Sequence, residues 1–391
     1  MKQSRFIVAA LSMSCITTLS SCFKEEPLNA ECDIEQAYIH VDNKILLNLL
    51  FTNPSDTLVN VQSDQTKIEF TMRPFAALTK QAPIFRLTPG ATISPESGSL
   101  QDFSKGPVTY VVTSENKQWS RTYQVSIKKG QTTILNEKEF EFEDAYLSKG
   151  YYNWQENWNG DILGIWATGN SGFNISNPSA KPEEYPTVMR EDGHRRKGVQ
   201  LTTRRTGGFA DVVKKPIAAG NLFIGQFNAT DALTDAMKAT KFGRPFSFSA
   251  KPVKLEGWYK YQAGEKFTDK NMQELDRHDY GTIYAVLYEN IDEKGNAVLL
   301  YGDNVQTSKQ IVALALVGET HDDNGKVAIG NTKEWHHFSV DFKYKKAIDP
   351  VKLKNGGYSL TIVSSSSSDG ANFLGAVGST LWIDSFKLIC E

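Results

Sequence analysis

The sequence predicts an all-β protein built from two β-sandwiches, a smaller one near the N-terminus and a larger jelly-roll after it. Short segments in which hydrophobic and polar residues alternate recur along the chain, as strands with one buried face require. Turn-forming Gly, Pro, Asn and Asp separate these segments, and aromatic residues make up 11% of the 391 residues. Residues 229–240 are the only stretch with a convincing helical pattern.

The first 21 residues predict a signal peptide that is not part of the fold. Lys2 and Arg5 precede an apolar run over residues 6–19, and this run ends in Leu19-Ser-Ser-Cys22. The combination resembles a bacterial lipoprotein signal, in which Cys22 becomes the lipid-carrying first residue of the mature protein. An ordinary secretory peptide with an incidental Cys is the alternative.

Residues 22–30 predict a lipid-anchored tether. Lys24-Glu-Glu26 resembles the export signal of surface lipoproteins in gut Gram-negative bacteria, which implies the outer membrane and the cell surface. A solvated tether whose charges carry no signal is the alternative. Cys32 and Cys390 remain after processing, and because they lie at opposite ends of the chain we expect free or buried thiols.

Residues 31–130 predict the smaller sandwich. Residues 108–112 and 123–127 each alternate with period two, and a polar turn over residues 114–120 joins them into an antiparallel hairpin. Together with the phrase at residues 84–98, this segment resembles the immunoglobulin-like modules that bacterial surface lipoproteins place beside their anchor. The resemblance implies a spacer.

Residues 131–391 predict the jelly-roll, because nine or ten strands with one minor helix fit two facing sheets. The hydrophobic positions are odd in residues 381–383 and even in residues 386–388, so we expect a β-bulge at Asp384-Ser385. A closing strand needs a partner, and the alternating residues 139–143 are the best candidate. The first and last strands of the domain are therefore predicted to lie together.

Four sequence segments of the C-terminal domain carry a family resemblance: residues 218–225, 257–261, 335–338 and the serine- and glycine-rich segment 364–384, here called the serine-glycine phrase. The last of these is fairly specific to the family. From about residue 135 to 391 the chain resembles the family called the putative carbohydrate metabolism domain. The resemblance implies a β-jelly-roll related to those of carbohydrate-active enzymes, with a sugar site.

A sugar presents C–H faces and hydroxyl edges, so its sites combine flat aromatic rings with charged or amide groups. The tryptophans that follow Tyr151 lie among Asn, Gly and Gln, and an exposed ring there would be costly unless it had a ligand. Burial of these rings in the core is the alternative. The predicted platforms are Trp154, Trp158 and Trp166, and the predicted polar groups are Arg204, Lys260, Tyr261, Glu289 and Asp384.

Glycoside hydrolysis needs two carboxyls roughly 5 to 10 Å apart, one of them with a raised pKa. Glu256, Glu289 and Asp384 are candidates, but spacing along the sequence selects no pair, so no catalytic residue is assigned. No cofactor is required. A structural Ca²⁺ is an open alternative, with Glu143 and Asp384 of the first and last strands as oxygen ligands.

The function predicted from the sequence is that of a monomeric surface lipoprotein of a Gram-negative bacterium that binds an oligo- or polysaccharide through its jelly-roll, without catalysis. A formal net charge of −2 gives no attraction to nucleic acid. Two alternatives stay open. One is a carbohydrate-active enzyme, a glycoside hydrolase or lyase, that uses the same concave face. The other is a non-catalytic adhesive or structural surface protein.

Overall fold

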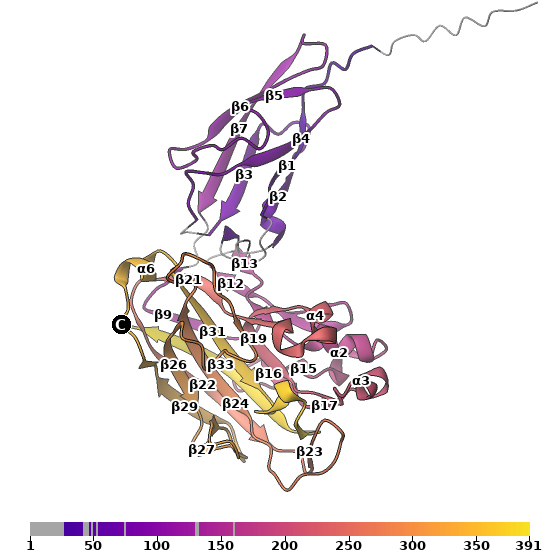
Figure 1. The fold of residues 1–391 in the computed structure, drawn as a ribbon, viewed down its shortest axis with the longest axis vertical. Coiled ribbons are helices and arrows are strands. Elements are labelled where there is room, and N and C mark those ends of the chain that lie inside the picture. Colours follow the sequence, from indigo (N-terminus) through magenta and orange to yellow (C-terminus); the bar gives the residue numbers. More distant parts are fainter. Residues whose placement is uncertain are drawn as a thin grey trace, which may run out of the picture.

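The structure is a computed structural model, and it describes residues 27–41, 47, 50–51, 54–73, 76–129, 133–158 and 161–391. They form two β-sandwiches, and the chain enters the smaller one at the end that points away from the larger (Figure 1). The predicted fold class is confirmed: an immunoglobulin-like sandwich precedes a β-jelly-roll. The predicted signal peptide and Cys22 lie outside the described residues.

The N-terminal sandwich packs a sheet of order β2-β1-β4 against one of order β3-β7-β6-β5. The predicted hairpin is present, with Tyr110 opposite Tyr123, and β3 runs parallel to β7. Hydrophobic residues between the sheets form a core of their own. Its strands are β1 (Ile34–Ile39), β2 (Leu58–Asn60), β3 (Lys67–Met72), β4 (Pro83–Leu87), β5 (Thr92–Ser94), β6 (Val108–Thr113) and β7 (Ser120–Lys129).

The jelly-roll is built from a ten-stranded sheet and a six-stranded sheet that face each other. The large sheet contains β25 (Leu300–Tyr301), β20 (Thr240–Phe242), β19 (Asn221–Phe227), β31 (Tyr358–Ser365), β24 (Thr282–Glu289), β26 (Ile311–Val317), β30 (Lys343–Tyr344), β14 (Trp166–Ala167), β21 (Arg244–Phe248) and β8 (Thr133–Ile134). The small sheet contains β15 (Thr187–Arg190), β16 (Gly198–Thr202), β33 (Thr380–Cys390), β22 (Pro252–Gln262), β29 (His336–Asp341) and β9 (Glu137–Phe140).

Short two-stranded pairs and helices complete the domain at its rims. The pairs are β10 (Ala145–Ser148) with β11 (Tyr151–Trp154), β12 (Glu156–Trp158) with β13 (Asp161–Leu163), β17 (Arg204–Arg205) with β18 (Ile217–Ala218), β23 (Phe267–Thr268) with β32 (Gly375–Ala376), and β27 (Thr320–His321) with β28 (Val327–Ala328). The helices are α2 (Asn170–Ser176), α3 (Gly208–Val212), α4 (Ala229–Thr234), α5 (Ala236–Ala239) and α6 (Pro350–Lys354), with 3₁₀ turns η1 (Pro54–Thr57), η2 (Pro182–Glu184) and η3 (Gly370–Asn372).

The single helix predicted over residues 229–240 is two short helices, α4 and α5. Asp235 separates them, because its carboxylate accepts hydrogen bonds from the backbone N–H groups of Met237 and Lys238 and so caps a new helix. In the described ranges, none of the helices has the length and hydrophobicity needed to span a membrane.

Strand β9, near the start of the jelly-roll, pairs with the last strand, β33, as predicted. Phe386 of β33 lies opposite Phe140 of β9, and the two strands run antiparallel. The expected bulge is also present, since the register of β33 against β22 shifts there and Ser385 has a left-handed φ of 52°. The bulge returns Phe386 and Leu388 to the buried face, so one closing strand contributes to the core along its whole length.

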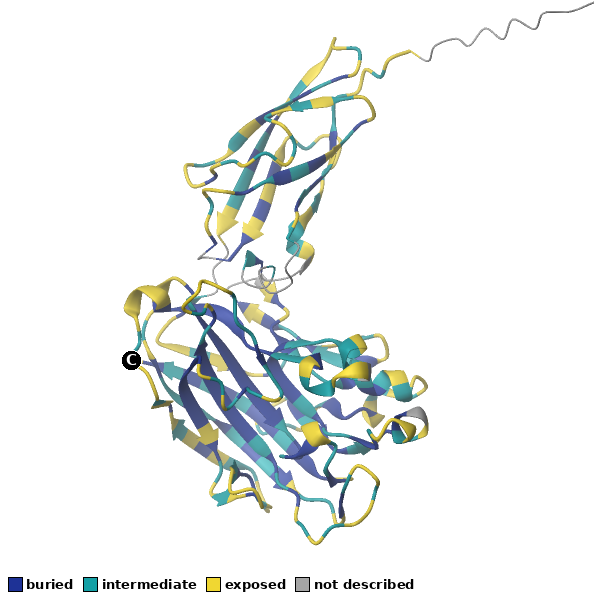
Figure 2. Cartoon of the chain, viewed as in Figure 1, coloured by how far each residue is buried: buried dark blue, intermediate teal, exposed yellow. Residues whose placement is uncertain are grey.

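The large sheet is buried on both faces. Its inner residues, such as Ala285 and Leu287, belong to the main core, while the alternate residues Tyr284 and Tyr288 pack in a second cluster with Leu300. That cluster lies under the segment of residues 290–310, and Figure 2 shows the central strands as mostly buried. The residues of this cluster therefore cover the middle of this face of the sheet.

Arg73 joins the two sandwiches. Its guanidinium is fully buried, and it donates from Nε to the Phe51 carbonyl (3.1 Å) in its own sandwich and from Nη1 to the Pro245 carbonyl (2.9 Å) in the jelly-roll. Burial, with a further contribution from Arg244, lowers the pKa of Arg73 to about 9. A buried guanidinium is costly unless it is hydrogen-bonded, and the partners of Arg73 come from both sandwiches. These bonds therefore favour the arrangement in which the two sandwiches meet at Arg73.

Arg73→Met, which keeps the volume but removes these donors, is expected to lower the free energy of unfolding by about 2–3 kcal/mol. Urea denaturation monitored by circular dichroism measures it. Arg86→Met is the matched control, because Arg86 pairs with Glu35 at the surface and such pairs contribute less than about 1 kcal/mol. Equal effects of the two variants would show that the bonds of Arg73 do not join the sandwiches.

Candidate functional site

The predicted aromatic platform is not on the surface. Trp154, Trp158 and Trp166 are 2%, 5% and 8% exposed and pack in the main core. The ring of Trp158 stacks on Phe246 with centroids 5.5 Å apart, and the indole N–H of Trp166 donates to Glu156 (2.8 Å). These rings stabilise the sandwich, so a sugar cannot stack on them in this structure.

The predicted polar groups are not brought together either. Tyr261 is fully buried and its hydroxyl donates to the Ser366 carbonyl (3.1 Å), whereas Arg204 lies in β17 and donates to the Glu183 carbonyl (3.4 Å). Burial raises the pKa of Tyr261 well above its ordinary value. Tyr261 is therefore a core residue, whereas Arg204 lies in one of the short strand pairs.

Glu289 ends β24 and forms ion pairs with Lys352 (2.7 Å) and Lys346 (3.3 Å). Burial alone would raise the pKa of Glu289, but the hydrogen bonds from the two lysines outweigh it and the pKa is lowered. The carboxylate is therefore occupied by a structural contact.

Glu143 and Asp384 both bind the turn of residues 191–197 between β15 and β16. Asp384 accepts a hydrogen bond from the backbone N–H of Arg195 (2.9 Å), and Glu143 accepts one from that of Lys197 (3.3 Å) and pairs with Arg196 (3.3 Å). Across the residues that the structure describes, no group of three or more His, Cys, Asp or Glu is placed to hold a metal ion. The two carboxylates hold a loop.

Lys260, the remaining predicted polar group, lies on a different surface, the outer face of the six-stranded sheet. Along β22, Leu255, Tyr259 and Tyr261 are buried, and the alternate residues Trp258 and Lys260 are only partly buried on the other face. The same alternation is visible in the sequence of residues 255–261, where Glu256, Trp258 and Lys260 alternate with Leu255, Tyr259 and Tyr261. Strand β22 therefore displays an aromatic ring and a cation side by side.

The neighbouring strands add two more half-buried tryptophans, and we call Trp258, Trp335 and Trp382 the tryptophan face. Trp382 of β33 lies opposite Lys260, whose ammonium is 5.5 Å from the centre of the indole ring. The indole N–H of Trp382 donates to the side chain of Gln200 (3.2 Å). Trp335 directly precedes β29, the strand on the other side of β22.

His194 organises the centre of the tryptophan face. Its imidazole stacks on the ring of Trp258, with centroids 3.8 Å apart and planes 13° apart, and meets Trp335 edge to face at 5.7 Å. It comes from the 191–197 turn, which Asp384 and Glu143 hold in place. His194 covers one side of Trp258, and all three rings of the tryptophan face are partly exposed.

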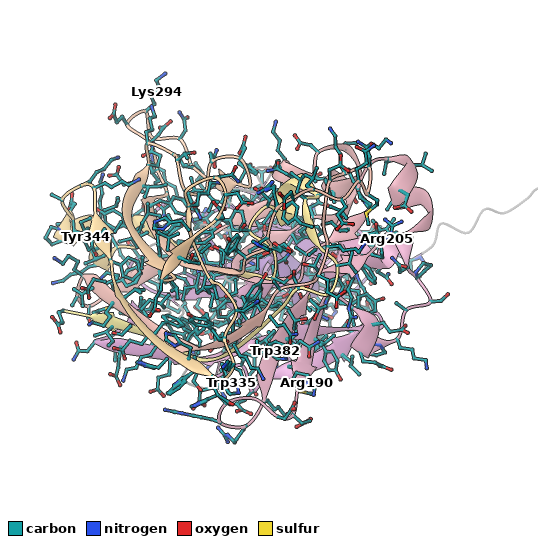
Figure 3. All side chains as sticks on the ribbon, turned by 90° about the horizontal axis from the view of Figure 1, so that it is seen from below. Arg190, Arg205, Lys294, Trp335, Tyr344 and Trp382 are labelled. Atoms are coloured by element: carbon teal, nitrogen blue, oxygen red, sulfur yellow. The ribbon has the colours of Figure 1, made fainter. Side chains whose placement is uncertain are left out.

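Figure 3 shows that Trp335, Trp382 and Arg190 lie together on one side of the molecule, opposite Lys294 of the segment that covers the large sheet. Arg190 is held by a two-pronged pair with Asp192 (2.9 and 3.1 Å). A small hollow of ≈ 80 Å³ adjoins the rings, and its lining residues are Glu139, Glu141, Arg195, Glu256, Gly257, Trp258, His337, Ser385, Phe386 and Lys387. Donors and acceptors of hydrogen bonds therefore border the aromatic surface.

A larger hollow of ≈ 340 Å³ lies beside Trp166, at the edge of the large sheet. Lys241, which pairs with Asp231 (3.5 Å), and the buried guanidinium of Arg244 line it. Only 8% of Trp166 is exposed, and its N–H is bound by Glu156, so the ring offers little surface for stacking. The tryptophan face has more accessible aromatic area.

Comparisons with known proteins agree with a carbohydrate-related domain. Residues 141–389 match the family model described as Putative carbohydrate metabolism domain, and residues 49–127 match the one described as SGBP, N-terminal. The crystal structure of a putative glycoside hydrolase from Bacteroides thetaiotaomicron is 35% identical, covers 94% of this chain and 99% of its own, and has a TM-score of 0.63. A second such structure, from Bacteroides vulgatus, is 38% identical over 67% of this chain and 100% of its own, with a TM-score of 0.58. No curated protein matches.

Proposed function

Because the chain belongs to the putative carbohydrate metabolism domain family, we propose that it is a surface lipoprotein that binds an oligo- or polysaccharide on the tryptophan face. The observation that carries the proposal is the gathering of Trp258, Trp335 and Trp382 on one partly exposed sheet face. Aromatic rings stack on the C–H faces of sugars, and nearby amide and charged groups bind hydroxyls.

Lipid anchoring is the second part of the proposal. Cys22 ends the apolar N-terminal run in the pattern of a lipoprotein signal, and the module that follows matches the family described as SGBP, N-terminal, the N-terminal part of surface glycan-binding proteins. In this arrangement the immunoglobulin-like sandwich separates the tryptophan face from the membrane. Labelled palmitate should be incorporated into the wild-type chain and not into Cys22→Ser.

Trp335→Ala and Trp382→Ala are each expected to weaken glycan binding about tenfold, since loss of one stacking ring costs about 1.4 kcal/mol. A glycan array identifies the ligand, and isothermal titration calorimetry then compares the variants. Trp119→Ala is the matched control, because Trp119 is an exposed ring on the other sandwich and its loss should leave affinity unchanged.

Unchanged affinity in both jelly-roll variants would remove the tryptophan face from the proposal. A wild-type chain that binds no glycan on the array would favour an adhesive or structural role toward another protein. Near-ultraviolet circular dichroism checks that each variant keeps its fold.

Glycoside hydrolysis is the second candidate, and one observation favours it. Glu256 and Glu139 both lie opposite Lys387 on the outer face, so their backbones are two strand spacings, about 10 Å, apart, and both residues line the hollow beside Trp258. An inverting mechanism needs two carboxyls roughly 6.5–9.5 Å apart, which side chains on these two strands can reach. Turnover of a bound glycan in a reducing-end assay, lost in Glu256→Gln, would establish hydrolysis, and binding without turnover would exclude it for that glycan.

A further inference from the structure

The N-terminal sandwich exposes two large apolar side chains at the end where the chain enters. Trp119 is 62% exposed and Leu28 is 58% exposed. Trp119 lies at the tip of the β6–β7 hairpin, and the hairpin tip is bound to the entering chain: the N–H of Asn116 donates to the Asn29 carbonyl (3.1 Å) and the N–H of Asn29 to Glu115 (2.8 Å). The two apolar side chains therefore belong to the same end of the sandwich.

The backbone that carries Trp119 is fixed. Its N–H donates to the Ser114 hydroxyl (3.1 Å) and its carbonyl accepts from the Ser114 N–H (3.0 Å), which closes the hairpin turn. Lys117, also exposed, lies in the same turn. An exposed indole with a lysine beside it is typical of residues that lie at the headgroup level of a membrane.

The short chain between Cys22 and the sandwich limits how far the end that carries Trp119 and Leu28 can lie from the membrane. Asn29 lies seven residues after Cys22, so even a fully extended chain places it at most about 25 Å from the lipid-carrying residue. The jelly-roll is attached at the opposite end of the sandwich, where Arg73 contacts Pro245 (Figure 1). Trp119 therefore belongs to the part of the molecule nearest the membrane.

We propose that Trp119 and Leu28 insert into the headgroup region of the membrane that holds the Cys22 lipid, and that this second contact fixes how the protein stands on the surface. The inference rests on the proposed lipid anchor. A lipid anchor alone leaves the orientation of the sandwich on the membrane unrestricted, whereas a second apolar contact beside the anchor restricts it, and with it the orientation of the tryptophan face.

The test uses the full lipidated chain in phospholipid vesicles with and without brominated acyl chains, which quench tryptophan emission at the boundary. The emission of Trp119 is the difference between the wild type and Trp119→Phe, and it is expected to fall at least twofold in brominated vesicles. Trp382→Phe supplies the control: the emission assigned to Trp382, on the jelly-roll, should be the same in both kinds of vesicle.

Equal Trp119 emission in both vesicles, in a protein that floats with them, would overturn the contact and leave the anchor standing. Equal quenching of Trp119 and Trp382 would also overturn it, because the protein would then have no fixed orientation. A chain that does not float with the vesicles would overturn the anchor and the contact together, while glycan binding in solution would still test the tryptophan face separately.

Discussion

Trp158→Ala is expected to lower the free energy of unfolding of the jelly-roll by about 3–5 kcal/mol, the range measured when a buried aromatic ring is removed from a core. The ring is 5% exposed, stacks on Phe246, and lies 4.9 Å from the ammonium of Lys138, so its removal takes both contacts away and leaves a cavity in the core. Chemical denaturation of the full chain, with the jelly-roll transition followed by near-ultraviolet circular dichroism, measures the change.

Trp382→Ala is the matched control for this experiment. The substitution is the same and the ring belongs to the same domain, but it is half-buried on the outer face of the small sheet, so the loss in stability should stay below about 1.5 kcal/mol. The two variants should therefore separate stability from glycan binding: Trp158→Ala affects mainly the first and Trp382→Ala the second. A Trp158→Ala chain with wild-type stability and weakened glycan binding would restore the platform predicted from the sequence.

Part of the fold was readable from the sequence, because strands of the N-terminal sandwich and of the six-stranded sheet bury one face and so leave a period-two pattern. The slip at Asp384-Ser385 located the bulge, and the matching alternation around Phe140 identified the partner of the last strand. The helix over residues 229–240 was misjudged in length, since the capping role of Asp235 depends on how its own backbone turns.

The candidate site was less accessible to sequence reasoning. Asn and Gln between Trp154 and Trp158 suggested an exposed loop. In the structure Asn157 is exposed in the middle of the short strand β12, and Glu156 and Trp158 on either side of it are buried. An alternating pattern that covers only three residues is too short to distinguish a strand from a loop.

The tryptophan face draws its residues from three distant segments of the chain. Only the register of β22 with β33 and β29 places Trp382 and His337 beside Lys260 and Trp258, and register is a tertiary property. One signal was present in the sequence. The strand Leu255–Tyr261 carries rings and charge on the face opposite its buried residues, which is unusual for a plain exterior.

The serine-glycine phrase, which is fairly specific to the family, has a structural role that the sequence did not reveal. Ser366 and Ser367 are buried, and their hydroxyls lie 2.8 and 2.6 Å from that of Thr203. Asp279, which is 3% exposed, lies at the centre of this network. Its Oδ2 accepts hydrogen bonds from Ser367 Oγ (2.6 Å), the Ala376 N–H (2.7 Å) and Ser379 Oγ (2.7 Å).

Asp279→Ala is accordingly expected to destabilise the jelly-roll by at least about 3 kcal/mol, because three buried donors lose their acceptor at about 1–3 kcal/mol each. Thermal and urea unfolding measure the loss. Asp292→Ala is the control: Asp292 accepts a similar set of bonds from Lys294 and Asn296 in a surface turn, where water can replace the carboxylate. Comparable losses in the two variants would contradict a central role for Asp279.

The same carboxyl gives a pH dependence of known sign. Burial raises the pKa of Asp279 above its ordinary value of 3.8, and the hydrogen bonds from Ala376, Ser367 and Ser379 only partly oppose it. Between the ordinary and the raised pKa the folded chain binds more protons than the unfolded chain, so stability falls as the pH rises through that window. The stabilising contribution is complete below pH 3.8 and is lost above the raised pKa. Asp279→Asn, which cannot titrate, should lack this decline, and a variant that keeps it would assign the effect to another group.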